Sequence, residues 1–206
     1  MAADSNKTPK IRPGDALPAR ELVALSDVPV AIPDPRQLVH LQFRRFAGCP
    51  VCNLHLQTFA RRHQELVGAS VREVVVFHSS ARELCAHAGG LPFAVLPDPD
   101  KRLYVEFGVE SAPRALLDPR AWWTIVRAVL ASLVAILRGR ARPPALVPHG
   151  GRFGLPADFL IAQDGRVLAC KYGEHVDDQW SVDDVLHLAG AERPAGAPAS
   201  PPQPAS

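Results

Sequence analysis

The sequence predicts an α/β fold in which a mixed central sheet is flanked by helices and carries an inserted amphipathic helix. Apolar runs at residues 38–43 and 71–77 alternate with stretches that have helix caps, a pattern typical of βαβ units with parallel strands. Residues 158–171 have the pattern of a hairpin around Asp164-Gly165. A length of 206 residues with 47% apolar residues fits one domain, which we place at residues 13–190.

The first half of the chain supplies most of the strands and helices of this domain. Residues 1–12 are polar, and we expect them to be flexible. A turn at residues 14–18 leads into short strands, and the strand 38–43 is followed by a helix over 50–67. After strand 71–77, Ser79 or Ser80 can cap a helix that reaches Ala88. A third strand at 93–96 and a helix over 100–107, ended by Gly108, complete this half.

The second half closes the domain with the hairpin and a final helix. Residues 159–162 and 167–169 are the expected hairpin strands, and Ser181 can cap a helix over 182–189. The tail from 191 to 206 is rich in Pro, Ala and Ser, so we expect it to be disordered.

The insertion, residues 119–150, contains a strongly apolar stretch over 121–137 whose single charge is Arg127. This stretch is shorter than the about 20 residues that a membrane span needs. On a helix, one face carries Trp122, Val126, Val129 and Leu133. Two interpretations remain open. The face covers the domain's own core or a homodimer interface, or residues 121–138 make a peripheral membrane contact, which the tryptophans and the trailing arginines would suit.

The most informative residues are Cys49-Pro50-Val51-Cys52, which end a buried strand and open a helix. Unpaired N–H groups and the helix dipole at that junction favour a thiolate over a thiol. Pro50 suits the first helical position, which makes Cys49 the N-cap. We therefore expect Cys49 to be the more exposed and more acidic thiol that attacks a substrate, and Cys52 to be the resolving thiol.

A structural zinc site would need four ligands, typically from a second Cys or His pair at similar spacing. Cys85 and Cys170 are isolated in the sequence, and His55 is the only nearby helper. We therefore expect no metal and no cofactor. We expect Cys85 and Cys170 to be structural, with Cys85 in the core.

Composition narrows the function classes further. The net charge of about +2 gives no reason to expect a nucleic-acid partner. The start of the chain has no apolar leader segment, so we expect a cytoplasmic protein, with peripheral membrane association if the insertion binds lipid. Thiols are kept reduced in the cytoplasm, which favours catalytic cysteines over a disulfide framework.

Four local patterns, in this order, carry a family resemblance. They are Gly14 to Pro18; Phe43 to Cys52; Leu91 to Asp100 with Tyr104 to Val109; and Phe159 to Val167. Together they resemble the peroxiredoxin-like branch of the alkyl hydroperoxide reductase/thiol-specific antioxidant (AhpC/TSA) family, within the thioredoxin-like superfamily. The likeness covers roughly residues 11–110 and 152–190.

The resemblance implies a thioredoxin-like fold and a thiol-dependent antioxidant enzyme. A Cys49/Cys52 dithiol would reduce hydroperoxides and be regenerated by a thioredoxin- or glutathione-like thiol donor. One alternative is a thioredoxin-type protein disulfide reductase acting on a protein disulfide, and another is a non-catalytic redox-sensing or membrane-associated binding module. The Thr-x-x-Cys motif of typical peroxiredoxins would place Cys49 at the threonine and make Cys52 the attacking thiol, whereas a thioredoxin-style alignment makes Cys49 the attacker.

The resemblance and the strand order also point to supporting residues. Pro156 matches a proline that is usually cis and faces the two cysteines in thioredoxin-like folds. Arg114 and Arg152 are candidates for the peroxide-binding arginine of the family. His78 follows strand 71–77 at its C-terminal end, where open α/β sheets place ligand sites, so it could tune a thiolate or be a hydrogen-bonded histidine at the rim.

Overall fold

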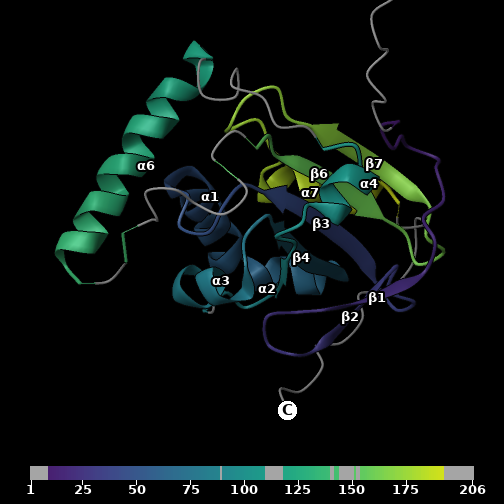
Figure 1. The fold of residues 1–206 in the computed structure, drawn as a ribbon. Helices are drawn as coiled ribbons and strands as arrows, with labels where there is room; N and C mark the ends of the chain where they lie inside the picture. Colours follow the sequence, from purple (N-terminus) through teal and green to yellow (C-terminus); the bar gives the residue numbers. More distant parts are fainter. Residues whose placement is uncertain are drawn as a thin grey trace, which may run out of the picture.

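The computed structural model of the chain describes residues 9–88, 90–109, 118–139, 142–143, 151 and 154–192 (Figure 1). Most of the N-terminal segment expected to be flexible, residues 1–8, and the tail from residue 193 lie outside the described residues.

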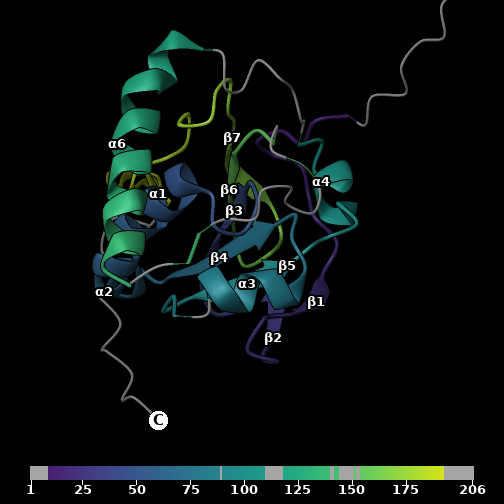
Figure 2. The same ribbon diagram turned by 60° about the vertical axis from the view of Figure 1, so that its left-hand side comes forward.

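A mixed five-stranded sheet forms the centre of the molecule, in the order β5-β4-β3-β6-β7 (Figures 1 and 2). Strands β3 (Leu38–Arg44), β4 (Val71–Phe77) and β5 (Ala94–Pro97) are parallel, whereas β6 (Ala157–Ile161) and β7 (Val167–Tyr172) are antiparallel. The predicted mixed sheet, with residues 38–43 and 71–77 side by side, is therefore confirmed. A separate two-stranded sheet pairs β1 (Arg20–Val23) with β2 (Pro29–Ile32).

Helices cover both faces of the sheet, because side chains alternate along each strand. In β3, Val39, Leu41 and Phe43 face one layer, where α4 (Arg102–Glu106) and the β1–β2 pair pack. The opposite layer holds α1 (Pro50–Arg61), α2 (His63–Gly68), α3 (Ala81–His87) and α7 (Val182–Ala191). The central strand thus has a helical layer on each side.

Helix boundaries follow capping residues. Ser80 and Ser181 each cap a helix with a reciprocal capping box, to Glu83 and Asp184 respectively, which confirms both predicted caps. The helix expected over 50–67 is instead two helices that meet at Arg62. Arg62 has a non-helical backbone, and its side chain is held by Glu65 and by Asp183 of α7.

The inserted helix α6 (Pro119–Leu137) packs beside α1 at the edge of the molecule (Figures 1 and 2). Ala128 of this helix is buried, Ile125 is half-buried, and Thr124 donates a hydrogen bond to Asp177 at 2.7 Å. Of the interpretations left open for the Trp122/Val126/Val129/Leu133 face, the one in which it covers the domain's own core is wrong, because all four side chains are exposed. Small side chains let α6 approach α1 closely, which bulky ones would prevent. Within the described part of the chain, no helix combines the length and the apolar character needed to cross a bilayer.

A buried polar network lies between the sheet and the α1/α7 layer. Arg44 donates to Asp158 at 2.7 Å, and His40 lies 2.9 Å from Glu73 and 3.3 Å from Asp158. Gln42 bridges the two halves by donating to Glu73 and accepting from Arg44. Two cationic side chains and two carboxyl groups thus offset one another in the interior, which is what makes their burial tolerable.

Candidate thiol active site

The two cysteines lie at the first turn of α1, as expected. Cys49 is the N-cap residue and Pro50 is the first helical residue. The backbone N–H of Cys49 donates to Phe46, and the first helical hydrogen bond runs from the N–H of Asn53 to the carbonyl of Cys49 at 2.9 Å. Both sulfur atoms therefore belong to the turn where the helix has unpaired N–H groups.

The loop between β3 and α1 is fixed by the strand beside it. Ser79 accepts a hydrogen bond from the backbone of Ala47, and the N–H of His78 donates to the carbonyl of Arg45. Gly48 has φ +77°, and a Cβ atom there would lie 2.9 Å from the ring of His87. Only glycine can therefore make this turn without displacing His87.

Both thiols are buried, Cys49 with 2% and Cys52 with 3% of its surface exposed. The expectation that Cys49 is the more exposed of the two is wrong. Ala128 of α6, Leu155 and Val176 join the apolar cluster that surrounds the cysteines. These segments, which are distant in the sequence, exclude water from the N-terminus of α1.

The two thiols nevertheless differ sharply in acidity. A hydrogen bond from the Cys52 thiol lowers the pKa of Cys49 to about 6, with help from the Arg45 cation and from the backbone N–H groups of Cys52 and Val51, which together outweigh burial. Burial, and then the neighbouring Cys49 sulfur, raise the pKa of Cys52 well above its usual value. Cys49 is thus the thiolate and Cys52 the thiol of the pair at neutral pH. This is the expected order, but its main cause is the hydrogen bond from Cys52 and not a greater exposure of Cys49.

Arg45 is the cation that the sequence analysis missed. Its Nη1 atom lies 3.6 Å from Sγ of Cys49, and the side chain is buried. A guanidinium at this distance stabilises a thiolate and can hydrogen-bond an oxygen atom that approaches the sulfur. The sequence feature that could have identified Arg45 is its position, one residue after a buried strand and four residues before Cys49.

Replacing Arg45 by Gln is expected to raise the pKa of Cys49 by about one unit, because an opposite charge is lost at contact distance. An ultraviolet titration of thiolate absorbance would measure the shift. Arg45→Lys should restore part of the effect, and Arg82→Gln, a change at an exposed residue of α3, should have none. An unchanged titration in Arg45→Gln would show that Arg45 does not act on the thiolate.

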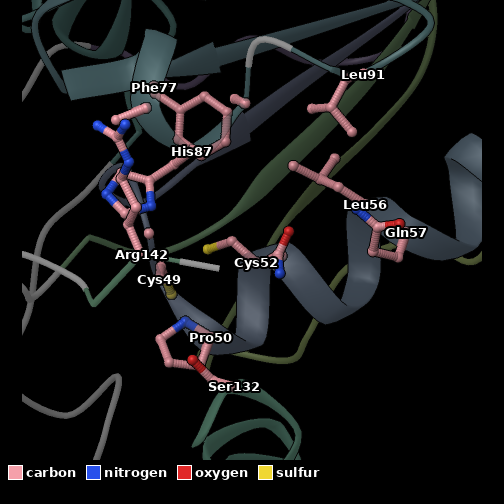
Figure 3. A pocket seen from close by; sticks show the side chains of 14 residues that line it. Cys49, Pro50, Cys52, Leu56, Gln57, Phe77, His87, Leu91, Ser132 and Arg142 are labelled. Carbon is pink, nitrogen blue, oxygen red and sulfur yellow. The ribbon is translucent and has the colours of Figure 1, made fainter. Parts of the chain in front are cut away.

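A pocket of about 200 Å³ adjoins the cysteines, and we call it the thiol pocket. Figure 3 shows Cys49 and Cys52 between His87 and Arg142 on one side and Leu56 and Leu91 on the other. Ser132 of α6 also lines it, so the insertion contributes to its wall. The complete lining is Gly48, Cys49, Pro50, Cys52, Asn53, Leu56, Gln57, Phe77, Ala86, His87, Ala88, Leu91, Ser132 and Arg142.

The supporting residues predicted from the family resemblance have different outcomes. Arg114 and Arg152 lie outside the described residues. The bond before Pro156 is expected to be cis from the resemblance, and this expectation is wrong. Among the described residues, the cis peptide bond lies between Ile32 and Pro33. The chain instead enters β6 in the trans form, and the carbonyl of Pro156 accepts a hydrogen bond from Gly173.

Four other residues singled out from the sequence do not line the thiol pocket: His55, His78, Cys85 and Cys170. His78 is buried with its ring edge-on to Tyr104 at 5.5 Å, and its backbone N–H donates to the carbonyl of Arg45. His55 lies 3.3 Å from Arg44 in the buried polar network. Cys85, expected in the core, is exposed, and the thiol of Cys170 donates to the carbonyl of Ile11. Within the described ranges, no three His, Cys, Asp or Glu side chains converge as a metal site would require.

Solved structures with a similar fold include two peroxiredoxin-type proteins. Peroxidoxin BcpB from Mycobacterium tuberculosis has a TM-score of 0.63 at 17% identity, over 89% of this chain and 99% of its own. A cysteine-to-serine mutant of PrxQ from Xylella fastidiosa has a TM-score of 0.61 at 16% identity, over 89% and 98%. A protein from Chlorobium tepidum described as a thiol:disulfide interchange protein DsbE has a TM-score of 0.53 at 16% identity, over 88% and 100%. At these identities the likeness shows the fold, which is thioredoxin-like.

No curated protein sequence matches the chain significantly. The sequence profile of the AhpC/TSA antioxidant enzyme family, however, matches residues 55–175, more than half of the chain. The match begins just after Cys52, so it identifies the family without testing the two cysteines. The chain belongs to the AhpC/TSA antioxidant enzyme family and is a thiol oxidoreductase with a thioredoxin-like fold.

Proposed function

We propose that the protein is a peroxiredoxin-like enzyme that reduces hydroperoxides with the Cys49/Cys52 dithiol. The observation that carries the proposal is the asymmetry of the pair: a Cys49 thiol whose pKa is about 6, hydrogen-bonded by a Cys52 thiol that stays protonated. At pH 7 a pKa of 6 leaves about 90% of Cys49 as thiolate, against about 3% for an ordinary cysteine.

The first step is attack of the Cys49 thiolate on the terminal oxygen of the hydroperoxide. The S–O bond forms as the O–O bond breaks, and the departing alkoxide takes a proton from solvent to become an alcohol. Cys49 is then a sulfenic acid. Arg45, at 3.6 Å from the sulfur, is placed to stabilise the negative charge as it moves from sulfur to oxygen.

The second step closes a disulfide. The sulfur of Cys52 attacks Cys49, the hydroxyl of the sulfenic acid leaves with the thiol proton as water, and the Cys49–Cys52 disulfide forms. A thioredoxin- or glutathione-like thiol donor then returns two electrons and two protons. The balance is one hydroperoxide and two donor thiols converted to one alcohol, one water and a donor disulfide.

Burial of the site favours a small oxidant over a protein disulfide. Attack on a protein disulfide requires the substrate's sulfur to reach Cys49, which lines a pocket and is only 2% exposed. A hydroperoxide of a few heavy atoms fits a cavity of about 200 Å³. The second candidate, a thioredoxin-type disulfide reductase, is supported by the Cys-x-x-Cys arrangement itself and by the DsbE likeness.

Two assays separate these functions. Stoichiometric hydrogen peroxide or cumene hydroperoxide is expected to convert the reduced protein to the Cys49–Cys52 disulfide within seconds, which mass spectrometry of the 49–52 peptide would detect as a loss of two hydrogens. Insulin reduction in the absence of peroxide should be slow. Fast insulin reduction by a protein that peroxide leaves reduced would establish the disulfide reductase instead.

A further inference from the structure

The inserted helix α6 presents an apolar surface to solvent, which we call the outer face of α6. Its members are each 43–77% exposed, and they are Trp122, Trp123, Val126, Val129, Leu130, Leu133, Val134 and Leu137. Figure 2 shows α6 along the outer edge of the molecule. Soluble monomers rarely leave so large a contiguous apolar patch uncovered, so this surface indicates a binding partner.

The orientation of the helix is fixed, so the outer face cannot turn inward. Ala128 is buried against the apolar cluster of the site, Ser132 lines the thiol pocket, and Thr124 is hydrogen-bonded to Asp177 at 2.7 Å. These three residues share one side of the helix, because they are four residues apart. The opposite side is the outer face.

The charged side chains described along α6 and just beyond it, Arg127 and Arg138, are both positive. Residues 119–157 contain six of the chain's 23 Lys and Arg residues and none of its 21 Asp and Glu residues. The rest of the chain is therefore net negative. Arg127 and Arg138, both exposed, lie along one edge of the outer face, since Arg127 is four residues from Trp123 and Arg138 is four from Val134.

We propose that the outer face of α6 binds the surface of an anionic phospholipid bilayer, with the helix lying parallel to the membrane. The 19 residues of α6 make a helix about 28 Å long. Its apolar side chains would enter the boundary between headgroups and acyl chains, the tryptophans would lie at headgroup level, and the arginines would pair with lipid phosphates. This proposal is independent of the thiol chemistry.

Charge argues against a second copy of the chain as the occupant. A symmetric dimer through this face would place the same patch on itself, so Arg127 and Arg138 of the two copies would approach one another, and α6 itself has no carboxylate to pair with them. Like charges brought together in an interface disfavour association. An anionic membrane supplies the negative charge that the segment lacks.

Vesicle sedimentation tests the proposal with the full chain. The wild-type protein is expected to bind vesicles of phosphatidylglycerol and phosphatidylcholine and to bind pure phosphatidylcholine vesicles much more weakly. Leu130→Glu should abolish binding. Its matched control is Val105→Glu on α4, which alters a side chain of similar exposure, 60% against 57%, and should bind as wild type.

Arg127→Gln/Arg138→Gln should weaken binding to the anionic vesicles by about 25-fold, or fivefold for each arginine. Arg82→Gln/Arg102→Gln, at exposed arginines elsewhere, should leave binding unchanged. Circular dichroism of Leu130→Glu should match wild type, which confirms that the variant is folded.

Three results would overturn the proposal: vesicle binding retained in Leu130→Glu, equal binding to neutral and anionic vesicles, or no vesicle binding at all. In the last case, a dimer in light scattering that Leu130→Glu dissociates would identify a second copy as the occupant.

Discussion

Replacing Cys49 by Ser is expected to lower peroxide-dependent turnover by at least about 10³-fold, the scale of loss when a nucleophile is removed from an enzyme. A serine hydroxyl does not ionise at neutral pH, so neither Arg45 nor the N-terminus of α1 can turn it into an anion. Hydroperoxide consumption coupled to a thiol donor would measure the loss. Cys85→Ser, at an exposed cysteine outside the thiol pocket, is the matched control and should turn over as wild type.

Cys52→Ser should behave differently from Cys49→Ser. Cys49 can still attack once, but no second thiol is present to displace water, so a sulfenic acid accumulates that dimedone would trap. The Thr-x-x-Cys alignment predicts the reverse pair of outcomes. A dead Cys52→Ser variant beside an active Cys49→Ser variant would make Cys52 the attacking thiol.

Asp158→Asn is expected to lower the free energy of unfolding by about 3–5 kcal/mol, because it leaves the buried Arg44 and His40 without their shared counter-charge. Arg44 donates to Asp158 at 2.7 Å, and both side chains are fully buried. Urea unfolding at pH 7 would measure the change. Asp183→Asn is the matched control: its carboxylate also pairs with an arginine, Arg62, but at the surface, and little change is expected.

The same network gives the stability a definite pH dependence. Although burial opposes it, the charge of Arg44 lowers the pKa of Asp158, so this contribution is present above the ordinary carboxyl pKa of about 3.9 and is lost as pH falls through the folded value. His40 is the opposite case. Despite its burial, Glu73 and Asp158 raise the pKa of His40 to about 9, so its contribution is complete below about pH 6.5 and is lost as pH rises through 9. The network therefore stabilises the fold most between about pH 4 and 6.5.

Local signals in the sequence were sufficient to predict the sheet and the position of the two thiols at the start of α1. The apolar runs of β3 and β4, the caps at Ser80 and Ser181, and the proline after Cys49 all act over a few residues, so the chain itself displays them. The order of acidity within the thiol pair is the expected one, but the reason given for it, a more exposed N-cap, is wrong. Both cysteines lie at the N-terminus of α1, and the hydrogen bond from Cys52 is the main factor that separates their acidity.

Burial of the site was not predictable, because it depends on segments far away in the sequence. Cys49 is covered by Ala128, Leu155 and Val176, about 80 to 130 positions further along the chain. Which face of α6 packs against the domain was not predictable for the same reason. Its pattern shows one bulky face and one small face, but only the neighbouring α1 decides that the small face packs inward.

Arg45 shows a further reason why a residue of the site could not be predicted from the sequence. The family resemblance indicates Arg114 and Arg152 as candidates for a peroxide-binding arginine, and both lie outside the described residues. Among the described residues, Arg45 contacts Cys49, and it lies just after β3, in the loop that His78 and Ser79 hold in place. A contact made by a loop is a matter of geometry, which residue spacing alone does not specify.

The central claim is that Cys49 is the thiolate that attacks, and the most direct measurement is the rate of iodoacetamide alkylation at each cysteine as a function of pH. Mass spectrometry of the 49–52 peptide locates the label. Cys49 is predicted to react first, with a midpoint near pH 6, where an ordinary thiol is almost wholly protonated. Labelling of Cys52 before Cys49, or a Cys49 midpoint near about 8.5, the value of an ordinary thiol, would contradict the account.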